Sequence, residues 1–374
     1  MNLASYKKPS ILVKNILKDN WDDYLLFNEV EDYQRKEVEK AIGCYGENKH
    51  GYLHYCKNCD MFLFLRLGCN SRICSCCGKR YTDQWSNSLS EAMFKVPHRH
   101  IVMSVPDVLW NYLDDWNHRK VYMDAAINAF NDYFSKILRR KVKIGVIVIL
   151  HPYGKDMKKQ PHLHLLITEG AFDFKGNFHK CEYIHANGFR KTWQYHVLKS
   201  FGNNGLDSRI VDDMYKKYPK GFYIWVHSKG KINNPKIISK YVGRYVRHPA
   251  IANTRITNYD KKTVTFFYVN NEDKKVFVKM EVHDFISALI QHIPPPQFKM
   301  IRYYGAYARR TKKKYGAGVQ SSINQTKLKD FGFKKLKCCP ICKKPLKFLG
   351  YYSKDPPQIK DGQKTMKKWM ELTS

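Results

Sequence analysis

The chain has 374 residues, which is long enough for two or three domains and a sizeable buried core. Hydrophobic residues make up 43% of it and aromatic residues 14%, a composition that excludes a disordered chain. The 66 Lys and Arg residues outnumber the 33 acidic residues and give a formal net charge of +33, which predicts a polyanionic partner. Nucleic acid is the first candidate, because the 26 Tyr and 20 Phe residues could stack on bases.

The chain shows no sign of a membrane segment or of disulfide bonds. Its longest strongly apolar run, residues 144–150, is too short to span a bilayer, and its first residues lack the apolar core of a signal peptide. Seven of the eleven cysteines lie between Cys44 and Cys77, and three lie between Cys338 and Cys342. Clustered cysteines without a secretion signal indicate metal ligands in a reducing compartment, so we expect a cytoplasmic bacterial protein with no membrane partner.

Three regions follow one another along the chain. Residues 1–95 begin with an amphipathic helical stretch, 11–42, and continue with the first cysteine cluster. Residues 96–310 alternate strand-like and helix-like stretches, and residues 311–374 form a basic tail that contains the second cysteine cluster.

The first cysteine cluster predicts a zinc site. Cys56 and Cys59 form one CxxC unit and Cys74 and Cys77 form a second, and two such units can close a tetrahedron of thiolates around structural Zn²⁺. These four are therefore the expected ligands, and four thiolates leave no open position for chemistry. Cys44 and Cys69, with His50 or His54, could make a second site, and Cys76 is then a bystander.

The middle region predicts an α+β fold with a sheet covered by helices. Pro235 at a first helical position, after Asn233 or Asn234 as N-cap, supports one of the helices. The strand candidates are 100–105, 142–150, 162–168 and 221–226, a hairpin joins 264–269 to 275–282, and the helix candidates are 109–140 and 235–247.

One of these strands carries two histidines on one face. His162, His164 and Leu166 share a face because side chains alternate along a strand, and two imidazoles at this spacing can hold one cation with positions left for a phosphate oxygen. The pair alone is weak evidence, and His98-Arg99-His100 offers a decoy with a charged central residue. The aliphatic background of the 162–168 strand favours the metal hypothesis, since polar residues there need a reason.

The helix 235–247 carries two tyrosines on one face. Tyr241 and Tyr245 are four residues apart, and Lys240, Arg244 and Arg247 flank them as expected DNA contacts. A tyrosine hydroxyl can attack a phosphodiester and keep the bond energy in a phosphotyrosine, while a metal held by histidines orients the phosphate. Two tyrosines would allow two sequential transfers. The alternative is an aromatic stripe that packs into the core.

The tail adds one more CxxC. Cys339 and Cys342 either form half of a metal site completed elsewhere or a turn without metal. Basic residues around them predict contacts to the DNA backbone without sequence specificity: Lys312 to Lys314, Lys334, Lys335 and Lys337.

The order of these motifs, from about residue 35 to 310, resembles the two-tyrosine HUH transposases of rolling-circle insertion sequences. Residues 45–85 look like the zinc-binding domain of that family, 100–106 like its first strand, 160–164 like its HUH motif and 241–247 like its two-tyrosine helix. Residues 284–286, 292–294 and 301–305 match its closing motif. Ser75 stands where the family commonly has Pro, and Gln160 where it commonly has His.

The resemblance implies a palm-like antiparallel sheet with covering helices, preceded by a small cysteine-rich zinc domain. It also implies a divalent metal, Mg²⁺ or Mn²⁺, held by His162 and His164, and 5′-phosphotyrosine intermediates formed by Tyr241 and Tyr245 on single-stranded DNA of the element ends and on target DNA. Such sites usually have a third metal ligand, for which His151 is preferred over Gln160. The alternatives are an HUH replication initiator or relaxase, or a non-catalytic zinc-dependent DNA-binding protein; whether the chain forms a homodimer is left open.

Overall fold

An antiparallel sheet forms the centre of the computed structural model, which describes residues 12–44, 51–181, 185–226, 251–270, 272–317 and 338–352. Its strand order is β11-β4-β5-β3-β7, and β6 pairs with the far end of β5. The longest strand, β5, therefore lies in the middle of the sheet. The strands are β3 (His98–Ser104), β4 (Lys143–Tyr153), β5 (Lys159–Phe172), β6 (Phe178–Lys180), β7 (Ile224–Val226) and β11 (Ile301–Gly305).

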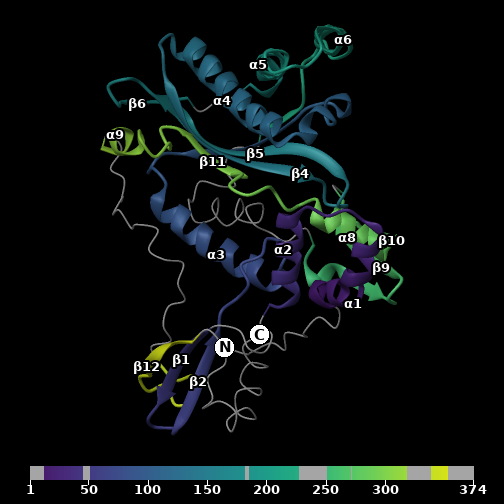
Figure 1. Cartoon of the computed structure of the whole chain (residues 1–374). Helices are drawn as coiled ribbons and strands as arrows, with labels where there is room; N and C mark the ends of the chain where they lie inside the picture. Colours follow the sequence, from purple (N-terminus) through teal and green to yellow (C-terminus); the bar gives the residue numbers. More distant parts are fainter. Residues whose placement is uncertain are drawn as a thin grey trace.

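The two faces of this sheet have different coverings. The helices α4 (Trp116–Leu138) and α5 (Ala186–Gly202) pack on one face, against alternate residues of β5 that include Leu163 and Leu165. The other face packs against α3 (Ser75–Ala92), and side chains of this helix share a small apolar cluster with Leu166 of β5. Figure 1 shows α4 and α3 on opposite sides of β4 and β5. The alternation predicted for this strand is therefore confirmed, and so is the α+β class.

The predicted helix 109–140 is shorter than expected. Two single 3-10 turns, Asp107–Leu109 and Tyr112–Asp114, precede α4, which begins at Trp116. The carboxylate of Asp115 accepts a hydrogen bond from the backbone N–H of Asn117 at 2.7 Å, so Asp115 is the N-cap that sets the start of the helix. The helices that the sequence did not predict are α3, α5, α6 (Ser208–Lys217), α8 (Val282–Ile290) and α9 (Lys312–Ala317).

A second core joins the opening helices to residues far along the chain. The helices α1 and α2 pack against a three-stranded sheet and the helix α8 that follows it. This cluster crosses the suggested boundary at residue 95, although the division into three regions stays a prediction. The hairpin predicted around residues 270–273 is confirmed as β9 and β10. The elements are α1 (Val13–Phe27), α2 (Asp32–Ile42), the 3-10 turn Asn253–Arg255, β8 (Ile256–Tyr259), β9 (Thr263–Val269), β10 (Lys275–Glu281) and α8 (Val282–Ile290).

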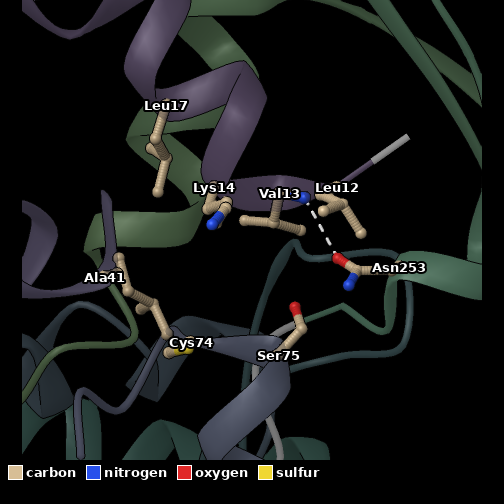
Figure 2. A pocket seen from close by; sticks show the side chains of 9 residues that line it. Leu12, Val13, Lys14, Leu17, Ala41, Cys74, Ser75 and Asn253 are labelled. Carbon is tan, nitrogen blue, oxygen red and sulfur yellow. Dashed lines mark hydrogen bonds between the residues drawn. The ribbon is translucent and has the colours of Figure 1, made fainter. Parts of the chain in front are cut away.

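The start of α1 has a long-range cap. The side-chain oxygen of Asn253 accepts a hydrogen bond from the backbone N–H of Val13 at 3.0 Å, which satisfies a donor that the helix itself leaves open. Figure 2 shows this bond beside a small pocket that Cys74 and Ser75, at the start of α3, also line. The opening helix is thus fixed to two other parts of the chain at its first turn.

A small third sheet combines distant segments. It has the strand order β12-β1-β2 and consists of β1 (Gly51–Cys56), β2 (Met61–Arg66) and β12 (Lys347–Tyr352). Figure 1 shows it apart from the central sheet. Among the described residues, no helix is both long and apolar enough to cross a membrane.

Candidate functional site

Three histidines meet on neighbouring strands of the central sheet. His162 and His164 lie on β5, and His151 lies on β4 directly opposite His162 in the antiparallel register. One ring nitrogen from each of the three lies within 4.8 Å of the others. The ring centroids of His162 and His164 are 5.0 Å apart, and those of His151 and His164 are 4.9 Å apart. The structure therefore brings the predicted pair together with the preferred third candidate, a grouping we call the histidine triad.

Hydrogen bonds orient two rings of the triad. The Nδ1 of His162 donates to the backbone carbonyl oxygen of Gln160 at 2.7 Å, which leaves the lone pair on Nε2. The Nδ1 of His164 lies 2.9 Å from the Nε2 of His100 on β3, and these two rings stack at an interplanar angle of 6°. Metal-binding imidazoles in proteins are held in this way through the nitrogen that does not ligate.

Electrostatics keep these rings neutral. Burial lowers the pKa of His162, and burial together with the neighbouring histidines His151, His162 and His100 lowers the pKa of His164 well below its ordinary value. A neutral imidazole is the form that binds a metal ion. The triad can thus hold a divalent cation with coordination positions left open for a substrate oxygen.

The decoy His98-Arg99-His100 separates into three roles. His98 Nε2 lies 2.6 Å from the hydroxyl of Tyr307, and Arg99 pairs with the carboxylate of Glu169, both in buried positions. His100, by contrast, contacts His164. The sequence interpretation missed His100. Alternation could have placed His100 on one face of β3, but that this face is shared with His164 follows only from the pairing of β3 with β5.

An open pocket lies where β4 and β5 leave the triad. Tyr153 of β4 pairs with Lys159 of β5, and both line this pocket together with Tyr33, Trp116 and Arg119. The guanidinium of Arg119 stands 4.0 Å above the ring of Trp116. Aromatic rings and basic groups therefore gather next to the triad.

The predicted tyrosines and their basic neighbours lie outside the described residues. These are Lys240, Tyr241, Arg244, Tyr245 and Arg247, together with the predicted helix 235–247. Their roles as nucleophiles and DNA contacts stay predictions.

The predicted grouping of the zinc ligands is wrong. Cys56, Cys59, Cys74 and Cys77 do not form one site, because β1 and β2 carry the first CxxC away from α3, which carries the second. Each pair instead belongs to a different cluster of four thiols. The opening cluster consists of Cys44, Cys69, Cys74 and Cys77; the hairpin cluster consists of Cys56, Cys59, Cys339 and Cys342.

The opening cluster has the dimensions of a zinc site. Its Sγ atoms are 3.5 Å apart for Cys44 and Cys77 and 3.8 Å apart for Cys69 and Cys77. Tetrahedral zinc with Zn–S bonds of about 2.3 Å requires sulfur–sulfur separations of roughly 3.8 Å. None of these four cysteines forms a disulfide, and three of them are buried. Cys44 and Cys69 thus complete a set of four thiols with the second CxxC, whereas His50 lies outside the described residues.

Comparisons with known proteins agree with both parts of this site. Residues 145–314, which contain the histidine triad, match a family model described as "Putative transposase", and residues 16–105 match one described as "Transposase zinc-binding domain". The chain is 28% identical to "Transposase for insertion sequence element IS801" of Pseudomonas savastanoi pv. phaseolicola, over 83% of this chain and 80% of that protein. It is 23% identical to "Putative transposase y4qJ" of Sinorhizobium fredii (strain NBRC 101917 / NGR234), over 74% of this chain and 75% of the relative. No solved structure matches it.

A transposase cleaves and joins DNA, so DNA is the polyanionic partner that the charge predicted. The two family matches and the IS801 relative together support an IS91-family rolling-circle transposase with a zinc-binding domain at its N-terminal side.

Proposed function

We propose that this transposase nicks and joins single-stranded DNA through 5′-phosphotyrosine intermediates, with Tyr241 and Tyr245 as nucleophiles and the histidine triad as the metal site. The observation that carries the proposal is the triad itself. His151, His162 and His164 converge from two paired strands, and each ring offers one nitrogen within 4.8 Å of the others. A purely structural role would not require three imidazoles to meet on two paired strands of the central sheet.

The chemistry is an exchange of one phosphodiester for another. The tyrosine Oη forms a bond to phosphorus while the bond from phosphorus to O3′ breaks, and the released 3′-hydroxyl takes up the proton that the tyrosine loses. Attack by a 3′-hydroxyl on the phosphotyrosine reverses the step and joins a new strand. Mg²⁺ or Mn²⁺ bound by the triad would polarise the scissile phosphate. Two tyrosines allow two strands to be held in turn.

The surroundings of the triad favour a single strand as substrate. The pocket next to it offers the rings of Tyr33, Trp116 and Tyr153, while its two basic side chains, Lys159 and the buried Arg119, pair with Asp114. Unpaired bases can stack on such rings, whereas a duplex keeps its bases paired and inaccessible.

The test is the formation of a covalent adduct. The full chain is incubated with Mn²⁺ and single-stranded oligonucleotides of the element ends, and denaturing electrophoresis detects protein–DNA species. We expect an adduct with the wild type, and at least about 100-fold slower formation with the double variant His162→Ala and His164→Ala, since metal polarisation contributes several kcal/mol.

His283→Ala is the matched control. His283 lies on α8, where its Nε2 contacts Asp23 at 3.0 Å, outside the triad. This variant should form the adduct at the wild-type rate. Absence of any adduct from the wild type, or equal rates for the triad variant and the control, would overturn the proposal.

A further inference from the structure

The hairpin cluster joins segments that are about 280 residues apart in sequence. Cys56 and Cys59 lie at the turn between β1 and β2, and Cys339 and Cys342 lie just before β12. The strand β12 pairs antiparallel with β1 from Gly51 to Tyr55, so backbone hydrogen bonds accompany the meeting of the thiols. The zinc-binding family model ends at residue 105 and contains only half of this cluster.

The distances within the cluster fit one tetrahedral metal ion. The Sγ atoms of Cys56 and Cys342 are 3.5 Å apart, and those of Cys59 and Cys339 are 4.0 Å apart. These values bracket the roughly 3.8 Å expected around zinc and are far above the roughly 2.05 Å of a disulfide. Cys338, although adjacent to Cys339, is exposed and is not part of the cluster.

The two CxxC turns have the same backbone form. Asp60 follows Cys59 with φ 49°, and Lys343 follows Cys342 with φ 60°. Both residues therefore adopt the left-handed conformation, which costs a residue with a side chain about 1 kcal/mol or more. In the second turn the N–H of Cys339 donates to the carbonyl of Lys344 at 2.7 Å, and the N–H of Lys343 donates to the carbonyl of Cys339 at 2.9 Å. Each CxxC turn is thus followed by a left-handed residue, and the thiols of the two turns meet in one cluster.

Apolar packing alone is too small to hold this sheet. Its buried apolar residues form two minor groups, Leu53 with Phe64, and Leu63 with Cys56 and Cys339. Phe348, Leu349 and Tyr351 of β12 remain exposed. A unit with so little core usually depends on a metal or a disulfide for its stability.

We propose that Cys56, Cys59, Cys339 and Cys342 bind a second structural zinc ion, so that the chain carries two. This ion closes the intervening catalytic segment, from β2 to residue 338, into a loop whose two ends are held together. The zinc-binding part of the protein is then complete only after the residues beyond the catalytic region have been made. The inference is independent of the nuclease proposal, because it concerns zinc content and not cleavage.

The test counts zinc in the purified full chain by inductively coupled plasma mass spectrometry. We expect about two zinc ions per wild-type chain and about one in the double variant Cys339→Ser and Cys342→Ser. The control Cys338→Ser changes a neighbouring thiol outside the cluster and should retain two. A second double variant, Cys69→Ser and Cys74→Ser, should lose the other ion. Equal zinc content in the wild type and in the Cys339/Cys342 variant would overturn the inference.

A second measurement uses only the wild type, in case the variant does not fold. Iodoacetamide is added to the native protein with and without a chelator, and mass spectrometry reads the alkylation of each cysteine. Cys338 should react in both conditions, whereas Cys59 and Cys342, which are only partly buried, should react at least about tenfold faster once the chelator is present. Rates for Cys59 and Cys342 that do not change with chelator would contradict the second site.

Discussion

His164 lies on β5 and contacts a histidine on each of the two flanking strands, β3 and β4. On one side its Nδ1 meets the Nε2 of His100, and on the other its ring faces His151. If His164 ligates through Nε2, its proton resides on Nδ1 and is donated to His100, which fixes the tautomer required for binding. His100 is thus a positioning residue for the proposed metal site, acting through His164.

Replacement of His100 by Leu should weaken metal binding without abolishing the chemistry. Loss of such a supporting hydrogen bond typically costs 10- to 100-fold in metal affinity, so the Mn²⁺ concentration for half-maximal adduct formation should rise by about that factor. The rate at saturating Mn²⁺ should stay close to that of the wild type. His100→Gln, which keeps a hydrogen-bond acceptor, should recover most of the loss.

The control for this prediction lies two residues away. His98→Leu removes the contact with Tyr307 and should lower the stability of the fold, but it should leave the half-maximal Mn²⁺ concentration unchanged. The same Mn²⁺ requirement in His100→Leu and in the wild type would show that His100 does not position His164.

At the scale of elements, alternation within a strand was predictable and pairing between strands was not. The sequence of residues 162–168 predicted which side chains share a face of the strand, because every second residue points the same way. That β4 and β3 lie on either side of β5, and so bring His151 and His100 to His164, depends on contacts far apart in sequence. Local patterns carry no information about such pairings.

The predicted grouping of the zinc ligands was wrong for the same reason. Spacing suggested that two neighbouring CxxC units share one metal, but β1 and β2 separate them, and each completes a cluster with thiols from elsewhere. The other four cysteines of the two clusters, Cys44, Cys69, Cys339 and Cys342, were all visible in the sequence. Their assignment required the fold, since several sets of four can be drawn from the same cysteines.

The end of β11 depends on a glycine. Gly305 has φ +55°, and a Cβ there would lie 1.8 Å from the carbonyl oxygen of Ile144 on β4. That carbonyl also accepts the N–H of Ala306 at 3.1 Å, so the close approach is part of the sheet edge. Gly305→Ala should therefore lower the free energy of unfolding by about 3 kcal/mol or more, measured by urea denaturation.

Gly205→Ala separates the backbone cost from the steric one. Gly205 also has a positive φ, +95°, but a Cβ there would meet nothing within 4 Å. Its substitution should cost only about 1–2 kcal/mol, the price of the left-handed conformation alone. Equal losses in the two variants would mean that the contact with Ile144 does not constrain β11.

At the scale of the whole molecule, the net charge of +33 predicts that contacts to phosphates supply much of the affinity for DNA. If about five phosphates are neutralised, the affinity for a single-stranded oligonucleotide should fall by about 100-fold between 50 and 200 mM salt, as measured by fluorescence anisotropy. An oligomer of the same bases on an uncharged backbone should bind weakly and with little dependence on salt. A salt-independent affinity for DNA would rule out phosphate contacts as its main source.

The central claim is that a tyrosine of the 241–245 pair becomes bonded to DNA, and peptide mapping of the adduct tests it most directly. Trypsin cleaves after Lys240, Arg244 and Arg247, so Tyr241 and Tyr245 fall on separate peptides that mass spectrometry distinguishes. We predict a 5′-phosphonucleotide on one or both of these peptides, formed only when metal is present and His162 and His164 are intact. DNA cleavage without any adduct, or a nucleotide attached to a residue other than these tyrosines, would contradict the claim.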